Sequence, residues 1–199
     1  FNINSKIKLS QLSLNEQEFL KPFFPKLRKY IVLKDQQIEI DYKNKSLGVK
    51  GSGKIQFEDK FEDIDFSFTK IKDNFNFDTQ INLQQTLFAI NFLNFEKKKQ
   101  LKTKIKISGI YNENSNLNLN KISVIEKDNK IMVNNLLINK TNQIKEVGKI
   151  DLDYFDTEGK RNIILINKIS KNNYQIKGQS FNANSLISDL IKYKDNKKI

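Results

Sequence analysis

Apolar and polar residues alternate at every second position along most of the chain. The alternation is plain at Ile64, Phe66 and Phe68, which are interleaved with Asp65 and Ser67. A β-strand points successive side chains to opposite faces, so such a run predicts a strand with one apolar face. Similar runs recur at roughly ten-residue intervals, as in a β-meander. They cover residues 3–9, 38–42, 47–57, 64–68, 75–83, 101–111, 117–119, 150–154, 164–166 and 174–178.

Turn-forming residues separate these runs. The stretches Lys127–Lys130 and Asp156–Gly159 combine Asp with Asn or Gly, residues that tolerate the positive φ of tight hairpin turns. The sequence therefore predicts short connections between antiparallel strands that follow one another along the chain.

Two stretches in the first half depart from the alternation. Asn15–Glu18 resembles a helix-capping pattern, and we expect a single helical turn through Leu20 before the prolines at 22 and 25 end it. Residues 22–30 are then the expected break, and a candidate sub-boundary, in what is otherwise a single β-rich segment over 1–199. The densely apolar stretch Leu87–Phe95 is expected to be a buried strand.

The C-terminal region predicts the one substantial helix. Apolar residues recur there at helical spacing, and an asparagine can cap the N-terminus at Asn182 or Asn184. The apolar stripe consists of Leu186, Ile187, Leu190 and Ile191.

About a dozen strands in one meander cannot remain a flat sheet. Twist has a fixed hand, and open sheets rarely exceed roughly ten strands without curling or splitting into two layers. We therefore expect an all-β, mainly antiparallel fold: a long curved meander that forms a trough, with a short C-terminal amphipathic helix. That helix covers little of the apolar face. Either the sheet closes as a sandwich or barrel around a core, or it stays open and its apolar wall binds an apolar ligand.

Composition argues against catalysis. The chain has no histidine and no cysteine, which removes the commonest general base, the commonest transition-metal ligand and all thiolate and disulfide chemistry. No Ser-Lys dyad or paired-carboxylate signature is recognisable. We expect no enzymatic activity, no cofactor and no metal site.

The net charge of +12 invites a nucleic-acid interpretation. Only Arg28 and Arg161 are arginines, however, and arginine is the residue best suited to bidentate phosphate and guanine contacts. The abundance of Lys, Asn and Ile is the bias of an AT-rich coding sequence. We expect a lysine-rich solvated face and no nucleic-acid partner; a basic module that binds an anionic polymer is the alternative.

Length adds two further expectations. No apolar run reaches the roughly 18–20 residues that span a bilayer. Because the chain begins with Phe1, we expect it to be a segment or mature fragment of a longer protein.

Three local clusters are better explained by structure than by ligand binding. The acidic cluster at 58–65 lacks the glycine and terminal Glu of a calcium-binding loop, so we expect a solvated strand face; its members are Glu58, Asp59, Glu62, Asp63 and Asp65. Lys97–Lys99 is expected to lie in a hairpin loop, with contact to anionic head groups as the alternative. Gly51-Ser52-Gly53 is expected to supply strand glycines at a bend, because it is too sparse for a phosphate-binding loop.

Residues 174–190 carry a resemblance to a known family. They read as a last strand ending at Gly178, then Phe181-Asn182, then a short amphipathic helix. This order resembles the closing element of the AsmA-like proteins, especially their YhdP-type branch. Asp usually stands at the position of Asn182 in that family, and Asn keeps the capping role. Lys104–Tyr111 and Lys149–Asn162 are similar to strands of the family's sheet.

The resemblance implies a function in the envelope of diderm bacteria. AsmA-like proteins are anchored in the inner membrane and extend through the periplasm, and they resemble bridge-like lipid-transfer proteins whose β-trough conducts phospholipid acyl chains toward the outer membrane. This chain would be a periplasmic slice of the trough, tethered through a part outside it. Its partners would be phospholipid or another amphipathic lipid and the flanking segments of the same protein. A scaffolding β-sheet module of the lipopolysaccharide-transport type is the alternative.

If the resemblance holds, the lipid-facing residues are the apolar ones that share one strand parity. Each of them would serve equally well in an ordinary core. They are Ile38, Ile40, Phe66, Phe68, Phe75, Phe77, Ile105, Ile107, Leu117, Leu119, Ile150, Leu152, Tyr154, Ile164 and Ile166.

Overall fold

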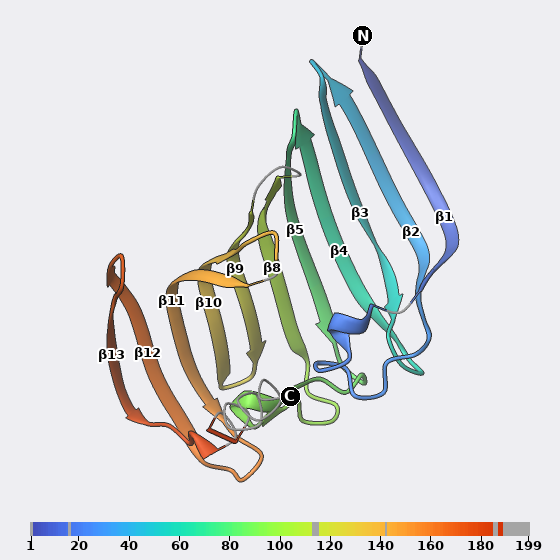
Figure 1. The fold of residues 1–199 in the computed structure, drawn as a ribbon. Coiled ribbons are helices and arrows are strands. Elements are labelled where there is room, and N and C mark those ends of the chain that lie inside the picture. Colours follow the sequence, from blue (N-terminus) through green and yellow to red (C-terminus); the bar gives the residue numbers. More distant parts are fainter. Residues whose placement is uncertain (1, 16, 113–115, 142, 185–186, 189–199) are drawn as a thin grey trace, which may run out of the picture.

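One antiparallel sheet of eleven strands dominates the computed structural model (Figure 1), which describes residues 2–15, 17–112, 116–141, 143–184 and 187–188. The strands follow one another in chain order, with β5 paired directly to β8. They are β1 (Ile3–Asn15), β2 (Tyr30–Lys43), β3 (Ser46–Gln56), β4 (Phe61–Ile71), β5 (Asn74–Leu83), β8 (Thr103–Asn112), β9 (Leu117–Glu126), β10 (Asn129–Ile138), β11 (Ile144–Phe155), β12 (Arg161–Ser170) and β13 (Asn173–Ser180).

The expected all-β antiparallel meander is confirmed, and the sheet is open. Among the described residues, β1 pairs only with β2 and β13 pairs only with β12, so the sheet does not close into a barrel. Figure 1 shows the strands rotating steadily from β1 to β13, so that the sheet curls around the small elements at its lower end. Of the two arrangements that the sequence left open, the curved open sheet is the one observed.

The register gathers the apolar residues on one face, called here the apolar face. Directly paired residues of neighbouring strands point to the same side. Ile105 on β8 is paired with Ile81 on β5 and with Val124 on β9. The same row continues outward to Ile64 on β4 and Ile131 on β10. On the opposite face, called the outer face, the residues between these rows are mostly charged or polar.

Glycines on the apolar face make room for large side chains from the next strand. A Cβ at Gly51 would overlap the Phe66 ring, and one at Gly109 would contact the Phe77 ring. Gly53 likewise accommodates the buried Gln36 side chain. The expectation of strand glycines at 51 and 53 is confirmed, and the space they leave is filled by the neighbouring strand.

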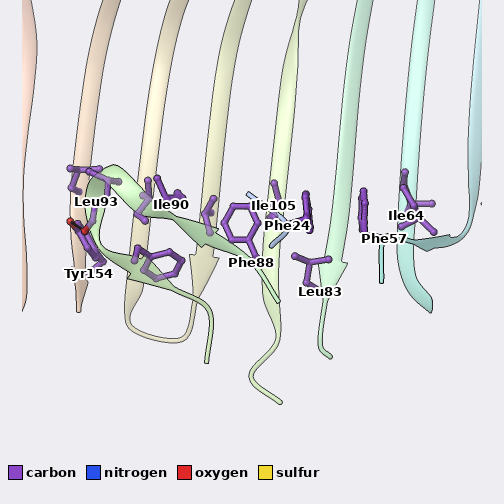
Figure 2. Packing of buried hydrophobic residues seen from close by; sticks show 14 of the residues in the cluster. Phe24, Phe57, Ile64, Leu83, Phe88, Ile90, Leu93, Ile105 and Tyr154 are labelled. Atoms are coloured by element: carbon purple, nitrogen blue, oxygen red, sulfur yellow. Dashed lines mark hydrogen bonds between the residues drawn. The ribbon is translucent and has the colours of Figure 1, made fainter. Parts of the chain in front are cut away.

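Two segments outside the main sheet, called here the cover segments, lie over one end of the apolar face. The first comprises residues 17–29 and includes the 3₁₀ turn η1 (Glu18–Leu20), as expected from the sequence. The second comprises residues 84–102 and contains the two-residue strands β6 (Ala89–Ile90) and β7 (Phe95–Glu96), joined by η2 (Asn91–Leu93). Figure 2 shows apolar side chains of both segments meeting those of the strands beneath.

The prediction of a buried strand over Leu87–Phe95 is wrong. The stretch does not join the main sheet; it turns back on itself at Asn94, which has a φ of 52°. Its apolar residues are buried because the turn presses them onto the sheet: Phe88, Ile90, Leu93 and Phe95 all belong to the buried cluster. The high density of apolar residues here belongs to a turn that covers the main sheet. The sequence pattern alone does not distinguish such a turn from a buried strand.

Residues 22–29 of the expected break belong to the first cover segment, and Tyr30 begins β2. Phe24 stacks on Phe57 with ring centroids 4.2 Å apart and meets Phe88 edge-on. At the other end of the chain, Asn184, Ile187 and Ser188 are helical, and the Ile187 N–H donates to the Ala183 carbonyl at 2.9 Å. The remainder of the expected helix, including Leu186, Leu190 and Ile191, lies outside the described residues.

Candidate functional site

The apolar face is divided into a covered end and an uncovered remainder. The covered end is the core of the protein, in which fifteen buried residues form one cluster. They come from both cover segments and from the strand ends beneath them. Beyond the cover the same apolar rows continue across the sheet with no described segment packed over them. The chemistry of the two parts differs.

Buried carboxylates hold the second cover segment on the sheet. Glu62 is only 4% exposed, and its carboxylate accepts the backbone N–H groups of Gln84, Gln85 and Thr86 at 2.9, 2.8 and 2.7 Å. Glu58, also buried, accepts the Leu87 N–H at 3.3 Å. The expectation of a solvated acidic face is therefore wrong at Glu58 and Glu62 and right at the three aspartates, which are exposed.

The distinction follows from strand parity. Glu62 is paired with Ile55 and shares the apolar face, whereas Asp63 and Asp65 point to the outer face. A carboxylate on the apolar face must be hydrogen-bonded once it is covered. The free N–H groups of the connection after β5 supply those bonds, so the acidic residue becomes an anchor for the cover.

A second anchor is built on Glu126. Its carboxylate accepts the Thr103 hydroxyl at 2.6 Å, the Asn129 amide at 3.3 Å and the Lys98 N–H at 3.4 Å. Lys97 lies nearby and is buried; its ammonium donates to the Gln84 carbonyl at 2.7 Å and to the Lys98 carbonyl at 3.2 Å. Burial lowers the pKa of Lys97, against the opposing pull of Glu126 and Glu62.

Lys97–Lys99 is thus divided between structure and solvent. Lys98 and Lys99 are exposed, as expected of loop lysines, but Lys97 faces two carboxylates and two carbonyls beneath the cover. That environment fits a structural lysine, because an ammonium engaged inside the protein does not reach a lipid head group.

Tyr154 fixes the cover from the β11 side. Its side chain is fully buried and lies beside Leu93 (Figure 2), to whose carbonyl its hydroxyl donates at 2.7 Å. Its ring meets Phe95 edge-on. Burial, and to a smaller extent the negative charge of Asp156, raises the pKa of Tyr154. Tyr154 therefore belongs to the packing of the covered end.

The fifteen residues predicted from strand parity all lie on the apolar face, but they fall into three groups. Ile105, Leu152 and Tyr154 are buried in the core cluster, with no surface left for a ligand. A second group is half-buried and packs against that cluster: Phe66, Ile107, Ile150 and Ile164. The third group is half-buried and lies beyond the cluster: Ile38, Ile40, Phe68, Phe75, Phe77, Leu117, Leu119 and Ile166.

The register adds residues that the sequence reasoning missed. Ile122 and Val133 are paired in the row that contains Ile107 and Ile150, and Ile176 extends this row onto β13. The alternation in β10 is interrupted at Asn135, which has a φ of 55° and lies at the level where the register between β8 and β9 shifts by one residue. Allowing for one skipped position there would have revealed the continuing pattern.

We call the residues of the second and third groups, together with these additions, the open apolar face. It crosses the sheet from β2 to β13 and ends in strongly exposed apolar side chains, such as Ile176 at 64% exposure. Within the described ranges, no group of three or more acidic residues is arranged to hold a metal ion. No helix among the described residues is both long and apolar enough to cross a bilayer.

Comparison with known proteins gave no match to a family model, to a curated protein or to a solved structure.

Proposed function

We propose that this protein binds the acyl chains of lipids on its open apolar face and has no enzymatic activity. The proposal is carried by a continuous apolar face that the described residues cover at one end only. Large contiguous apolar surfaces on proteins generally mark binding sites. Here the cover segments show that the chain can bury such a surface. They nevertheless cover only the apolar rows at one end of the strands.

The dimensions suit an extended hydrocarbon chain. Neighbouring strands are about 4.8 Å apart, so the ten intervals between eleven strands make a wall on the order of 48 Å long. A lipid tail in one leaflet is about 15 Å long, half the thickness of a bilayer core. Burial of a methylene contributes about 0.8 kcal/mol, so a tail with eight methylenes against the wall would gain roughly 6 kcal/mol before the cost of association.

The resemblance to AsmA-like proteins supports a more specific form of the proposal. In that form the chain is a periplasmic slice of a longer lipid-conducting trough between the inner and outer membranes, tethered to the inner membrane through a part outside it. The two open sheet edges are compatible with strands of flanking segments that extend the wall. Acyl tails would shield the apolar rows while head groups stay in water.

Lipid that co-purifies with the protein tests the proposal. We expect mass spectrometry of the protein in non-denaturing buffer to find phospholipid or another amphipathic lipid bound. Leu119→Glu should abolish its retention, whereas Asn118→Glu, one residue away on the outer face, should leave it unchanged. A lipid-free protein that also fails to take up added lipid would refute the proposal.

Binding to duplex DNA separates the proposal from the basic-module alternative. Lysine contacts to phosphates lose affinity steeply with salt, so we expect little binding at about 150 mM salt. Tight, salt-resistant binding would favour the anionic-polymer function instead.

A further inference from the structure

The turns at the uncovered end of the sheet carry an excess of positive charge. Five connections between consecutive strands lie there. Those at 43–46, 71–74 and 170–173 are described in full, and a fourth, at 139–143, is described except for residue 142. Among the charged residues described in these four turns, only Asp73 is acidic. The others are Lys43, Lys45, Lys72, Lys140 and Lys171, and all five are exposed. We call these five lysines the open rim.

The opposite end of the same sheet has a different charge balance in its tight turns. Its three tight turns, at 57–60, 127–128 and 156–160, contain more acids than lysines. Lysines in two of them are engaged locally: Lys160 pairs with Glu158 at 2.5 Å, and Lys127 lies 3.8 Å from Asp128. None of the open-rim lysines forms an ion pair with a described residue. The cover segments at this end are themselves basic, with Lys21, Lys26 and Lys29 in the first and Lys98, Lys99 and Lys102 in the second. What distinguishes the open rim is that its lysines border the uncovered part of the apolar face.

The apolar row next to the open rim has the character of an interface between apolar and aqueous surroundings. Tyr42 and Tyr111 lie in this row, and tyrosine suits a site where one end of the side chain is apolar and the other is wet. Phe75 is paired with Tyr111, and the Lys70 ammonium lies 4.5 Å from the centre of the Phe75 ring. The Lys70 ammonium therefore lies among apolar side chains, in the row where a bound acyl tail would end.

The spacing of the rim turns is regular. Consecutive hairpins at one end of a meander are two strands apart, or about 10 Å. The chain between β8 and β9, which lies between the turns of Lys72 and Lys140 in the order of the sheet, contains no lysine. The open rim therefore has a pair of basic turns on each side of that connection, and a phosphate at either pair would lie close to a lysine. A lysine ammonium on a flexible stem binds phosphate as a point charge without requiring one fixed geometry. Such a row can hold successive head groups without selecting a single position.

We infer that the open rim binds the phosphate of anionic lipid head groups while their tails lie on the open apolar face. This inference rests on the proposed function and adds a preference in lipid class: anionic phospholipids bind more tightly than uncharged lipids with the same tails. Charge complementarity between the five lysines and the phosphates is the source of the preference.

The test compares two lipids with identical acyl chains, phosphatidylglycerol and diacylglycerol. Each is offered as a labelled minor component of phosphatidylcholine vesicles, and the label retained by the re-isolated protein is counted. The rim variant replaces all five lysines by Gln. A matched variant replaces five exposed lysines of the outer face by Gln: Lys8, Lys50, Lys104, Lys121 and Lys177.

We expect the rim variant to retain phosphatidylglycerol roughly five- to thirtyfold less well, the effect of one or two lysine contacts near a lipid surface. Its retention of diacylglycerol should be unchanged, and the outer-face variant should retain both lipids like the wild type. The preference of the wild type for phosphatidylglycerol should decline at high salt.

Two results would overturn the inference while leaving acyl-chain binding intact: equal retention of phosphatidylglycerol by the wild type and the rim variant, or an equal loss in the outer-face variant. Competition by glycerophosphate as effective as by intact lipid would also overturn it, because the tail would then play no part. If the wild type retains neither lipid, the proposed function itself fails, and the inference fails with it.

Discussion

The anchoring of the second cover segment by Glu62 can be tested by a single substitution. Glu62→Ala removes three hydrogen bonds of 2.7 to 2.9 Å between one buried carboxylate and the N–H groups of residues 84–86. A hydrogen bond to a charged group contributes about 1.5–3 kcal/mol, and an unsatisfied buried donor costs a similar amount. Thr86 is buried, whereas Gln84 and Gln85 are exposed and their N–H groups can regain water. We therefore expect a loss of about 3–5 kcal/mol.

The assay is urea unfolding followed by circular dichroism, with Asp63→Ala as the control. Asp63 is the next residue but lies on the outer face, where it forms an exposed ion pair with Lys54. Exposed ion pairs contribute about 0–1 kcal/mol, so the control should unfold almost like the wild type. Hydrogen exchange should also accelerate at residues 84–102 in Glu62→Ala. A loss below about 1 kcal/mol, with unchanged protection of the cover, would refute the anchoring role.

Other predictions concern the same covered end. Tyr154→Phe should cost about 1–2 kcal/mol in urea unfolding, because it leaves the buried Leu93 carbonyl without its donor. Because burial raises the pKa of Tyr154 above its unfolded value of about 10, the wild type should lose stability as pH rises beyond 10 and Tyr154→Phe should lose less; parallel pH profiles would contradict this. Lys97→Met should cost about 2–4 kcal/mol, since it leaves Glu62 and Glu126 without their buried cation, whereas Lys99→Met should change stability by less than about 0.5 kcal/mol. Equal effects at 97 and 99 would show that Lys97 is not structural.

Strand parity made most of the fold predictable from the sequence. Alternation predicts which residues of one strand share a face. The fifteen predicted residues all lie on the apolar face because the pairing of neighbouring strands places them on the same side of the sheet. An open sheet was harder to foresee, since the same alternation would fill the core of a sandwich. That outcome depends on long-range closure, which local pattern does not encode.

The covered end was the least predictable part. Glu62 and Asp63 are adjacent acids with opposite environments, and only the path of residues 84–102 over the sheet decides which of them is buried. The same path makes Lys97 a core residue and Lys99 a solvated one. Tertiary contact overrides residue type at all of these positions.

Site-specific photocrosslinking to lipid tests the central claim most directly. A photoreactive phenylalanine analogue would replace Phe77, on the open apolar face, or Asp78, its neighbour on the outer face. After incubation with labelled phosphatidylglycerol vesicles and illumination, we predict a lipid adduct at position 77 and none at position 78. Equal labelling at the two positions, or labelling at 78 alone, would contradict the assignment of the apolar face as the lipid-binding surface.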